Sequence, residues 1–185
     1  MLLGDITDYR NIGDWSYILL AILIVDLIVL FLTRYFPDFL GKNLNIWYEQ
    51  FGLSAVISDV FIIAIGFALA RYAYKYFQPV NYDSFNLWLF MALLVGIQVL
   101  HDILFYVFVI LPIPKGHNRM MDVFKNYAAS GGGKIIAADA AMVVASAFFA
   151  MILKETPADI VTLIGLFSVY TLPYILETTN KFSLD

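Results

Sequence analysis

Five long apolar stretches run through this chain, and they constrain its fold more than any other feature. Each has about 20 residues, the length that an α-helix needs to cross the roughly 30 Å hydrocarbon core of a bilayer. The stretches cover residues 15–34, 51–71, 85–111, 134–153 and 158–176. The sequence therefore predicts an all-α fold, a polytopic transmembrane helix bundle with five spans in one domain over residues 1–185.

A soluble fold would need polar surface to enclose these stretches, and the chain has too little of it. Hydrophobic residues make up 62% of the 185 residues and charged residues 14%, against roughly 45–50% and 25% in ordinary soluble domains. We therefore expect the lipid bilayer as a partner. The net charge of −4 comes without a clustered basic face, which argues against a nucleic-acid partner. The absence of cysteine excludes disulfides, thiolate metal sites and cysteine nucleophiles.

The longest connection between spans, residues 112–133, has a helical pattern of its own. Apolar residues recur at helical spacing at Met120, Met121, Phe124 and either Tyr127 or Ala128. With charged residues on the other side, this pattern predicts a short interfacial helix over residues 118–128 that lies on the membrane. The run Ser130-Gly131-Gly132-Gly133 is predicted to form a flexible hinge into the fourth span.

Lysine and arginine are distributed unequally between the two faces of this predicted bundle. One face carries Arg34, Lys42, Lys115, Arg119, Lys125, Lys134 and Lys181. The opposite face carries Arg10, Arg71, Lys75 and Lys154. Because cytoplasmic loops are enriched in these residues, the first face is predicted to be cytoplasmic. The N-terminus of this multi-pass protein would then lie outside and the C-terminus inside.

Four spans carry one aspartate each, near the same predicted membrane face: Asp26, Asp59, Asp102 and Asp139. Counted from the inner ends of their spans, all four lie roughly 8–14 Å below that face. Gln98, His101 and Asp102 share one helix face because they are spaced i, i+3 and i+4. His101 and Asp102 nevertheless diverge by about 100°, so we expect them to contact different partners. Ionisable residues inside a span are costly and by default indicate a functional site.

Four carboxylates close together in a low-dielectric interior cannot all stay ionised without compensation. Protonation of some of them, a bound cation or an aqueous cavity would each provide it. One histidine with several aspartates suits a hard divalent ion better than zinc. A bound cation is therefore the only cofactor that the sequence suggests, and the identity of a metal stays open. The alternative is structural, with each aspartate satisfied by its own neighbours.

The remaining polar signals are weaker. Lys115, His117 and Arg119 lie at the same predicted face and are candidates for contact with lipid headgroups. The sequence shows no pairing of a nucleophile with a base, so no catalytic residue is predicted. The run Gly131-Gly132-Gly133-Lys134 lacks the first glycine and the Ser/Thr of a phosphate-binding loop, which excludes a nucleotide site of that type.

Two segments carry a resemblance to known sequences. Residues 47–74 (WYEQFGLSAVISDVFIIAIGFALARYAY) and 98–127 (QVLHDILFYVFVILPIPKGHNRMMDVFKNY) resemble uncharacterised multi-span membrane proteins encoded by large DNA viruses of algae and protists. The likeness covers the second to fourth spans. It implies a host-derived or virion membrane as the location, and it carries over no catalytic residue.

Three functions therefore stay open. The first is a structural or interaction role in a membrane, with homo-oligomers formed through small-residue helix faces. The resemblance to viral proteins implies a viral or virus-modified membrane for this role. The second is a cation or proton transporter or channel built on the aspartates and His101. The third is a membrane-embedded lipid-modifying enzyme, although the pattern favours a non-enzymatic role.

Overall fold

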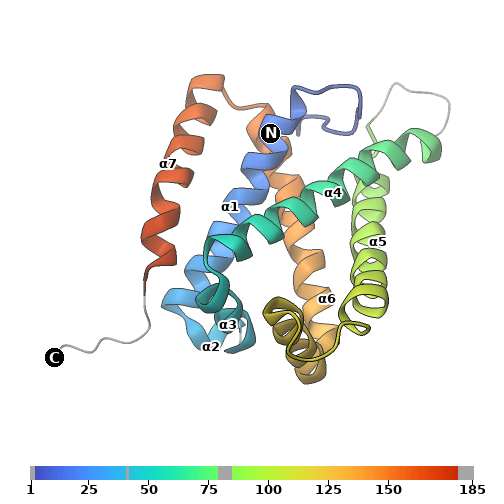
Figure 1. Ribbon diagram of the computed structural model, residues 1–185. Coiled ribbons are helices and arrows are strands. Elements are labelled where there is room, and N and C mark those ends of the chain that lie inside the picture. Colours follow the sequence, from blue (N-terminus) through green and yellow to red (C-terminus); the bar gives the residue numbers. More distant parts are fainter. Residues whose placement is uncertain (1–2, 41, 79–84, 179–185) are drawn as a thin grey trace.

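The computed structural model describes residues 3–40, 42–78 and 85–178, and these are almost entirely helical (Figure 1). Helices make up 82% of the structure, and the described ranges contain no strand. The helices are α1 (Asp14–Tyr35), α2 (Pro37–Leu40), α3 (Lys42–Phe51), α4 (Leu53–Phe77), α5 (Leu87–Phe105), the π-helical η1 (Tyr106–Ile110), α6 (Arg119–Lys154) and α7 (Ala158–Leu176). The predicted all-α bundle is confirmed.

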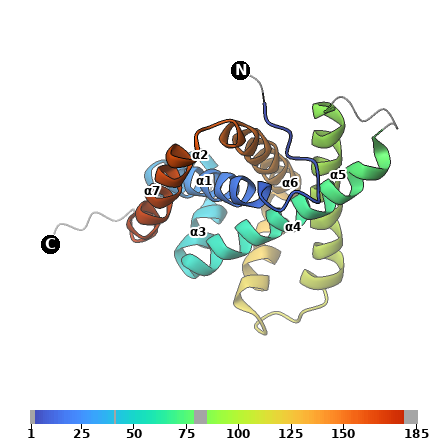
Figure 2. The ribbon, with the colours of Figure 1, turned by 90° about the horizontal axis from the view of Figure 1, so that it is seen from above.

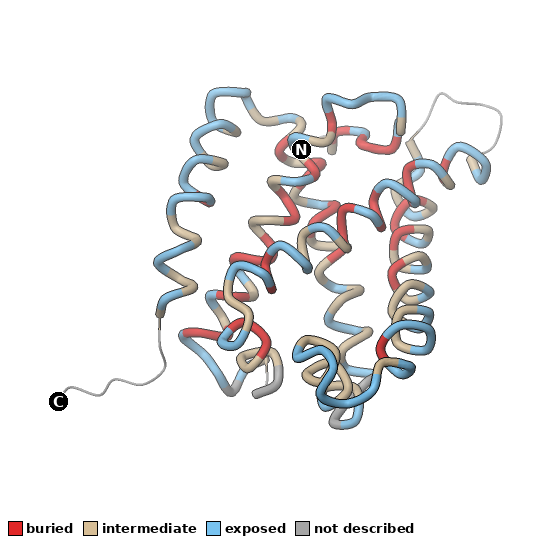
Figure 3. The backbone as a smooth tube through the Cα atoms, viewed as in Figure 1, coloured by how far each residue is buried: buried red, intermediate tan, exposed pale blue. Residues whose placement is uncertain are grey.

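Five segments are long and apolar enough to cross a membrane: Asp14–Tyr35, Leu53–Phe77, Leu87–Ile110, Gly133–Lys154 and Ala158–Leu176. Each overlaps a predicted span, and the largest difference is in α4, which continues to Phe77 beyond the predicted end at residue 71. Their outward faces are apolar and exposed, as on α7, where Leu163, Leu166 and Phe167 are 65%, 65% and 67% exposed (Figure 3). Such a surface fits lipid as the surrounding medium. The fold is thus that of an integral, multi-pass membrane protein.

The prediction of a flexible hinge at residues 130–133 is wrong. Helix α6 is continuous from Arg119 to Lys154, so the predicted interfacial helix and the fourth span form one helix. Its first turn is capped by Asn118, whose side chain accepts hydrogen bonds from Met120 N at 2.9 Å and Met121 N at 3.3 Å. Each glycine inside a helix costs only about 1 kcal/mol relative to alanine, and the long helical segments on both sides outweigh the cost of three.

Helix α3 is a short amphipathic helix that the sequence analysis did not predict. Its apolar residues Leu44, Trp47, Tyr48 and Phe51 recur at i, i+3, i+4 and i+7 and pack into the bundle. In Figure 1 it lies with α2 and the first turns of α6 at the lower end of the bundle, whereas the N-terminal segment and the α6–α7 connection lie at the upper end.

Helix α1 occupies the centre of the bundle (Figures 1 and 2). It packs against α4, α6 and α7, and the α1–α6 contact is the most extensive in the structure. Helix α5 packs against α4 and α6 on the far side, while α7 rests mainly on α1. Which end faces the cytoplasm stays a prediction. That prediction rests on the positions of lysine and arginine. Two of these, Lys181 and the side chain of Lys42, lie outside the described part of the chain.

Candidate functional site

Two of the predicted aspartates, Asp26 and Asp59, accept hydrogen bonds from neighbouring residues of α3, Tyr48 and Trp47. Asp26 on α1 is completely buried, and Tyr48 Oη donates a hydrogen bond to Asp26 Oδ1 at 2.7 Å. The same hydroxyl interacts with the carboxyl group of Asp59 on α4. Trp47 Nε1 donates a hydrogen bond to Asp59 Oδ2 at 2.9 Å. Helix α3 thus supplies donors to carboxyl groups from two different spans.

Tyr48 is held in a setting that keeps its hydroxyl protonated. Its side chain is 1% exposed and lies in the lower core with Leu30, Ala55 and Val56. Burial, together with the neighbouring carboxyl groups, raises the pKa of Tyr48 well above its ordinary value. The phenol therefore acts as a hydrogen-bond donor throughout the physiological pH range.

Asp102 on α5 is bonded to its own helix. Gln98 Nε2 donates to Asp102 Oδ1 at 2.8 Å, as two residues spaced i, i+4 can. His101 Nδ1 lies 3.2 Å from the same oxygen, so the expectation that His101 and Asp102 contact different partners is wrong. The ring nitrogen nearest the backbone reaches the neighbouring carboxyl group even though the two residues leave the helix in different directions. The ring of His101 stacks on Phe105, with centroids 5.5 Å apart.

Asp139 on α6 completes the group. Its carboxyl group lies within electrostatic range of both Asp102 and Asp59. Tyr127, earlier on α6, lies close enough to Asp139 and Asp59 for burial and these charges to raise the pKa of its phenol. Asp59 is in turn within electrostatic range of Asp26, so each of the four aspartates of the predicted layer has another of them as a neighbour. We call them the acidic layer.

The acidic layer does not contain a preformed metal site. Within the described ranges, no three histidine or acidic side chains lie close enough together to hold a metal ion. A bound cation therefore stays a prediction. Asp26 Oδ2 and Asp102 Oδ2 are both buried and have no hydrogen-bond partner among the described residues. Buried carboxyl oxygens without a hydrogen-bond donor are unusual in folded proteins.

The predicted lipid-contacting residues lie at the lower end of the bundle. Lys115, His117 and Arg119 are all exposed, in the connection before α6 and in its first turn. The guanidinium group of Arg119 lies over the ring of Phe51, 5.8 Å from its centroid. None of the three belongs to the acidic layer, and their contact with headgroups stays a prediction.

A second buried polar cluster, which the sequence analysis did not predict, lies at the upper end. Asp14 at the start of α1 binds two cations: Arg71 Nη2 of α4 lies 3.2 Å from its Oδ2, and Lys154 Nζ of α6 lies 2.7 Å from its Oδ1. Arg71 also donates to the backbone carbonyls of Asn11 and Asp8, and its guanidinium group lies 5.4 Å from the ring centroid of Trp15. This ionic cluster ties α1, α4 and α6 to the N-terminal segment.

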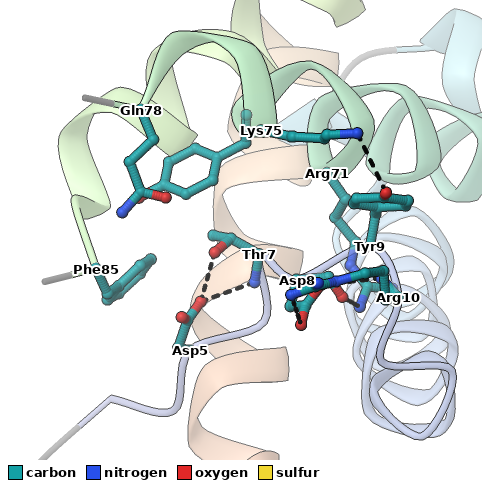
Figure 4. Close-up of a pocket in the computed structure, with 10 residues that line it drawn as sticks. Asp5, Thr7, Asp8, Tyr9, Arg10, Arg71, Lys75, Gln78 and Phe85 are labelled. Carbon is teal, nitrogen blue, oxygen red and sulfur yellow. Dashed lines mark hydrogen bonds and ion pairs between the residues drawn. The ribbon is translucent and has the colours of Figure 1, made fainter. Parts of the chain in front are cut away.

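A cavity of about 520 Å³ lies beside the ionic cluster, between the N-terminal segment and the end of α4 (Figure 4). Its charged side chains are engaged by neighbouring residues. Asp8 binds Arg10 through both carboxylate oxygens, at 3.0 and 3.2 Å, and these hydrogen bonds lower the pKa of Asp8. Lys75 Nζ lies 3.4 Å from the hydroxyl of Tyr9. The cavity therefore fits a structural role in seating the N-terminal segment.

Replacing Gly4 by alanine tests how tightly that segment is seated. A Cβ atom at Gly4 would lie 2.9 Å from Lys154 Cβ and 2.9 Å from Glu155 Oε1. Because Lys154 Cβ cannot move without α6, we expect Gly4→Ala to lower the free energy of unfolding by about 1–3 kcal/mol. Thermal unfolding in detergent, followed by circular dichroism, measures the change. The control is Gly96→Ala, where a Cβ would meet nothing within 4 Å and helix propensity favours alanine. Equal losses in both variants would contradict this packing.

No family model, no curated protein and no solved structure matches the chain. The resemblance to viral membrane proteins and the expected homo-oligomer therefore stay predictions.

Proposed function

We propose that the protein carries protons in a membrane by means of the acidic layer, with Asp26, Tyr48 and Asp59 as the central relay. The observation that carries this proposal is the buried hydroxyl of Tyr48, which donates to Asp26 at 2.7 Å and also interacts with Asp59. A phenol between two carboxyl groups can accept a proton from one while it donates to the other. Intramembrane acidic residues in such chains are typical of proton relays.

The lack of compensating cations supports protons as the cargo. Among the described residues, no lysine or arginine forms an ion pair with any aspartate of the acidic layer, and His101 is the only base in contact with one. The unpartnered oxygens Asp26 Oδ2 and Asp102 Oδ2 are positions where a carboxyl group can hold a proton of its own. A cluster that binds protons needs no metal ligand set.

The apolar packing above the acidic layer favours a carrier over an open channel. Ile22, Phe67, Leu94 and Val143 are completely buried in the upper core. The same core contains one polar exception on α6: Ser146 Oγ is buried and has no hydrogen-bond partner in the described part of the chain. Tyr48, by contrast, lines a cavity at the lower end. Protons would therefore reach the acidic layer from the lower end, and transfer to the upper end would need a change of conformation.

Proton flux into liposomes tests the proposal. The purified protein is reconstituted with an enclosed pH-sensitive dye, and a valinomycin-clamped potassium gradient drives protons inward. We expect flux above that of protein-free liposomes, falling to that background in Asp59→Asn. Asp159→Asn, at the exposed start of α7, is the matched control and should keep wild-type flux.

Two results would overturn the proposal: wild-type liposomes that are no faster than empty ones, or an Asp59→Asn variant that is as fast as the wild type. Circular dichroism of each variant establishes that it is folded. If Asp59→Asn alters only stability or oligomeric state and no protein-dependent flux exists, the structural role is supported instead.

A further inference from the structure

A cavity of about 740 Å³ opens at the lower end of the bundle, between the ends of α1 and α7 and the α3–α4 junction. Its polar side chains include Arg34, Glu49 and Glu177, and its apolar wall includes Leu53, Leu172 and Leu176. Arg34, Leu53 and Leu176 lie in the first or last turn of their spans. Because spans end where the hydrocarbon core ends, the cavity lies at the level of the lipid headgroups.

Arg34 is a buried cation with weak partners. Its side chain is 5% exposed, yet its hydrogen bonds are long: 3.4 Å from Nη1 to Asn45 Oδ1 and 3.2 Å from Nη2 to the carbonyl of Leu176. Its Nε has no hydrogen-bond partner within the described ranges. Charge-assisted hydrogen bonds of arginine are ordinarily about 2.7–2.9 Å long. The guanidinium group, which lines the cavity, therefore has hydrogen-bonding capacity that its protein partners leave unused.

Two carboxylates accompany this cation. Glu49 Oε1 lies 3.7 Å from Arg34 Nη1, and its side chain is 49% exposed. Glu177, directly after α7, is also exposed and acts on Arg34 electrostatically. One cation beside two carboxylates would repel a purely anionic headgroup. The same arrangement is complementary to a zwitterion, whose phosphate meets the guanidinium group while its ammonium group meets the carboxylates.

We propose that this cavity binds a zwitterionic phospholipid with a primary ammonium headgroup. The phosphate pairs with Arg34, the ammonium group donates hydrogen bonds to Glu49 and Glu177, and the acyl chains run along Leu53 and Leu176. A quaternary ammonium group has no N–H to donate and binds these carboxylates less well. This site uses neither Asp26 nor Asp59, but Tyr48 of the proposed relay also lines the cavity. The test below therefore measures lipid binding directly and does not depend on proton flux.

Native mass spectrometry of the delipidated protein in detergent tests the site. The probes are short-chain phosphatidylethanolamine, phosphatidylcholine and phosphatidylglycerol, each at several concentrations. We expect the wild type to bind phosphatidylethanolamine about fivefold more tightly than the other two, and the double substitution Glu49→Gln, Glu177→Gln to abolish that preference. Glu155→Gln, exposed at the upper end, is the control and should retain it.

Arg34→Lys adds a second measurement, because a point charge replaces the guanidinium fork. It should weaken binding of all three lipids while the order among them is kept. Equal binding of the three lipids by the wild type would show that the cavity contacts lipids without distinguishing their headgroups. Tighter binding of phosphatidylglycerol would make it an anion site. Either result, or an unchanged preference in the double variant, overturns the proposal.

Discussion

Replacing Asp14 by asparagine is expected to lower the free energy of unfolding by about 3–5 kcal/mol, the range for breaking a buried ion pair by removing one partner. Asp14 is 2% and Arg71 1% exposed in their side chains, and Lys154 approaches the other carboxylate oxygen at 2.7 Å. Asparagine keeps the shape but removes the only carboxylate that pairs with these two cations in the described residues. Arg71 would then stay buried with backbone carbonyls as its remaining acceptors.

Titration with sodium dodecyl sulfate in mixed micelles, followed by helix content, measures this loss. Asp159→Asn makes the same chemical change in the first turn of α7, where the residue is exposed, and should change stability by less than about 0.5 kcal/mol. A midpoint for Asp14→Asn equal to that of the control would show that the ionic cluster does not stabilise the bundle. Lys154→Met should give a smaller loss, since Lys154 is 24% exposed and Arg71 still pairs with Asp14.

The five spans could be predicted because a span depends on local properties alone. Length and apolarity over about 20 residues decide whether a segment crosses the bilayer, whatever its neighbours are. Helix α3 has only 10 residues, and its Trp47 and Tyr48 also suit the aromatic border of a membrane. Residue type alone therefore does not distinguish a contact with Asp26 and Asp59 from a place at that border. The apolar spacing of α3 was the available signal.

The depth of the acidic layer could be predicted by counting residues, but the partners of its members could not. Counting residues gives the height of a side chain along the helix axis, but it does not give the direction in which the side chain points around that axis. Only the local pair Gln98 and Asp102 followed from spacing within one helix. The ionic cluster shows the same limit. Asp14, Arg71 and Lys154 lie at matching ends of three spans. Their opposite charges are a signal for pairing that the prediction of orientation does not use.

Replacing Tyr48 by phenylalanine should reduce proton flux on the order of 10²-fold, the lower range for loss of a positioned proton-transfer group. The substitution removes one oxygen atom and retains the ring that packs against Leu30 and Val56. Asp26 Oδ1 loses its donor at 2.7 Å, so stability should fall by about 1–3 kcal/mol as well. Since the pKa of Tyr48 is raised well above its ordinary value, the loss should be the same at every pH from 6 to 8.

Tyr72→Phe is the matched control, because Tyr72 is exposed on α4 and its hydroxyl contacts only that of Tyr76 among the interactions described. It should leave both flux and stability unchanged. The same liposome assay separates the remaining possibilities. If Tyr48→Phe conducts normally while Asp59→Asn does not, protons pass between the carboxyl groups without the phenol. If both variants conduct normally, the hydroxyl of Tyr48 serves only to hold α3 against α1 and α4, and the acidic layer is a packing device.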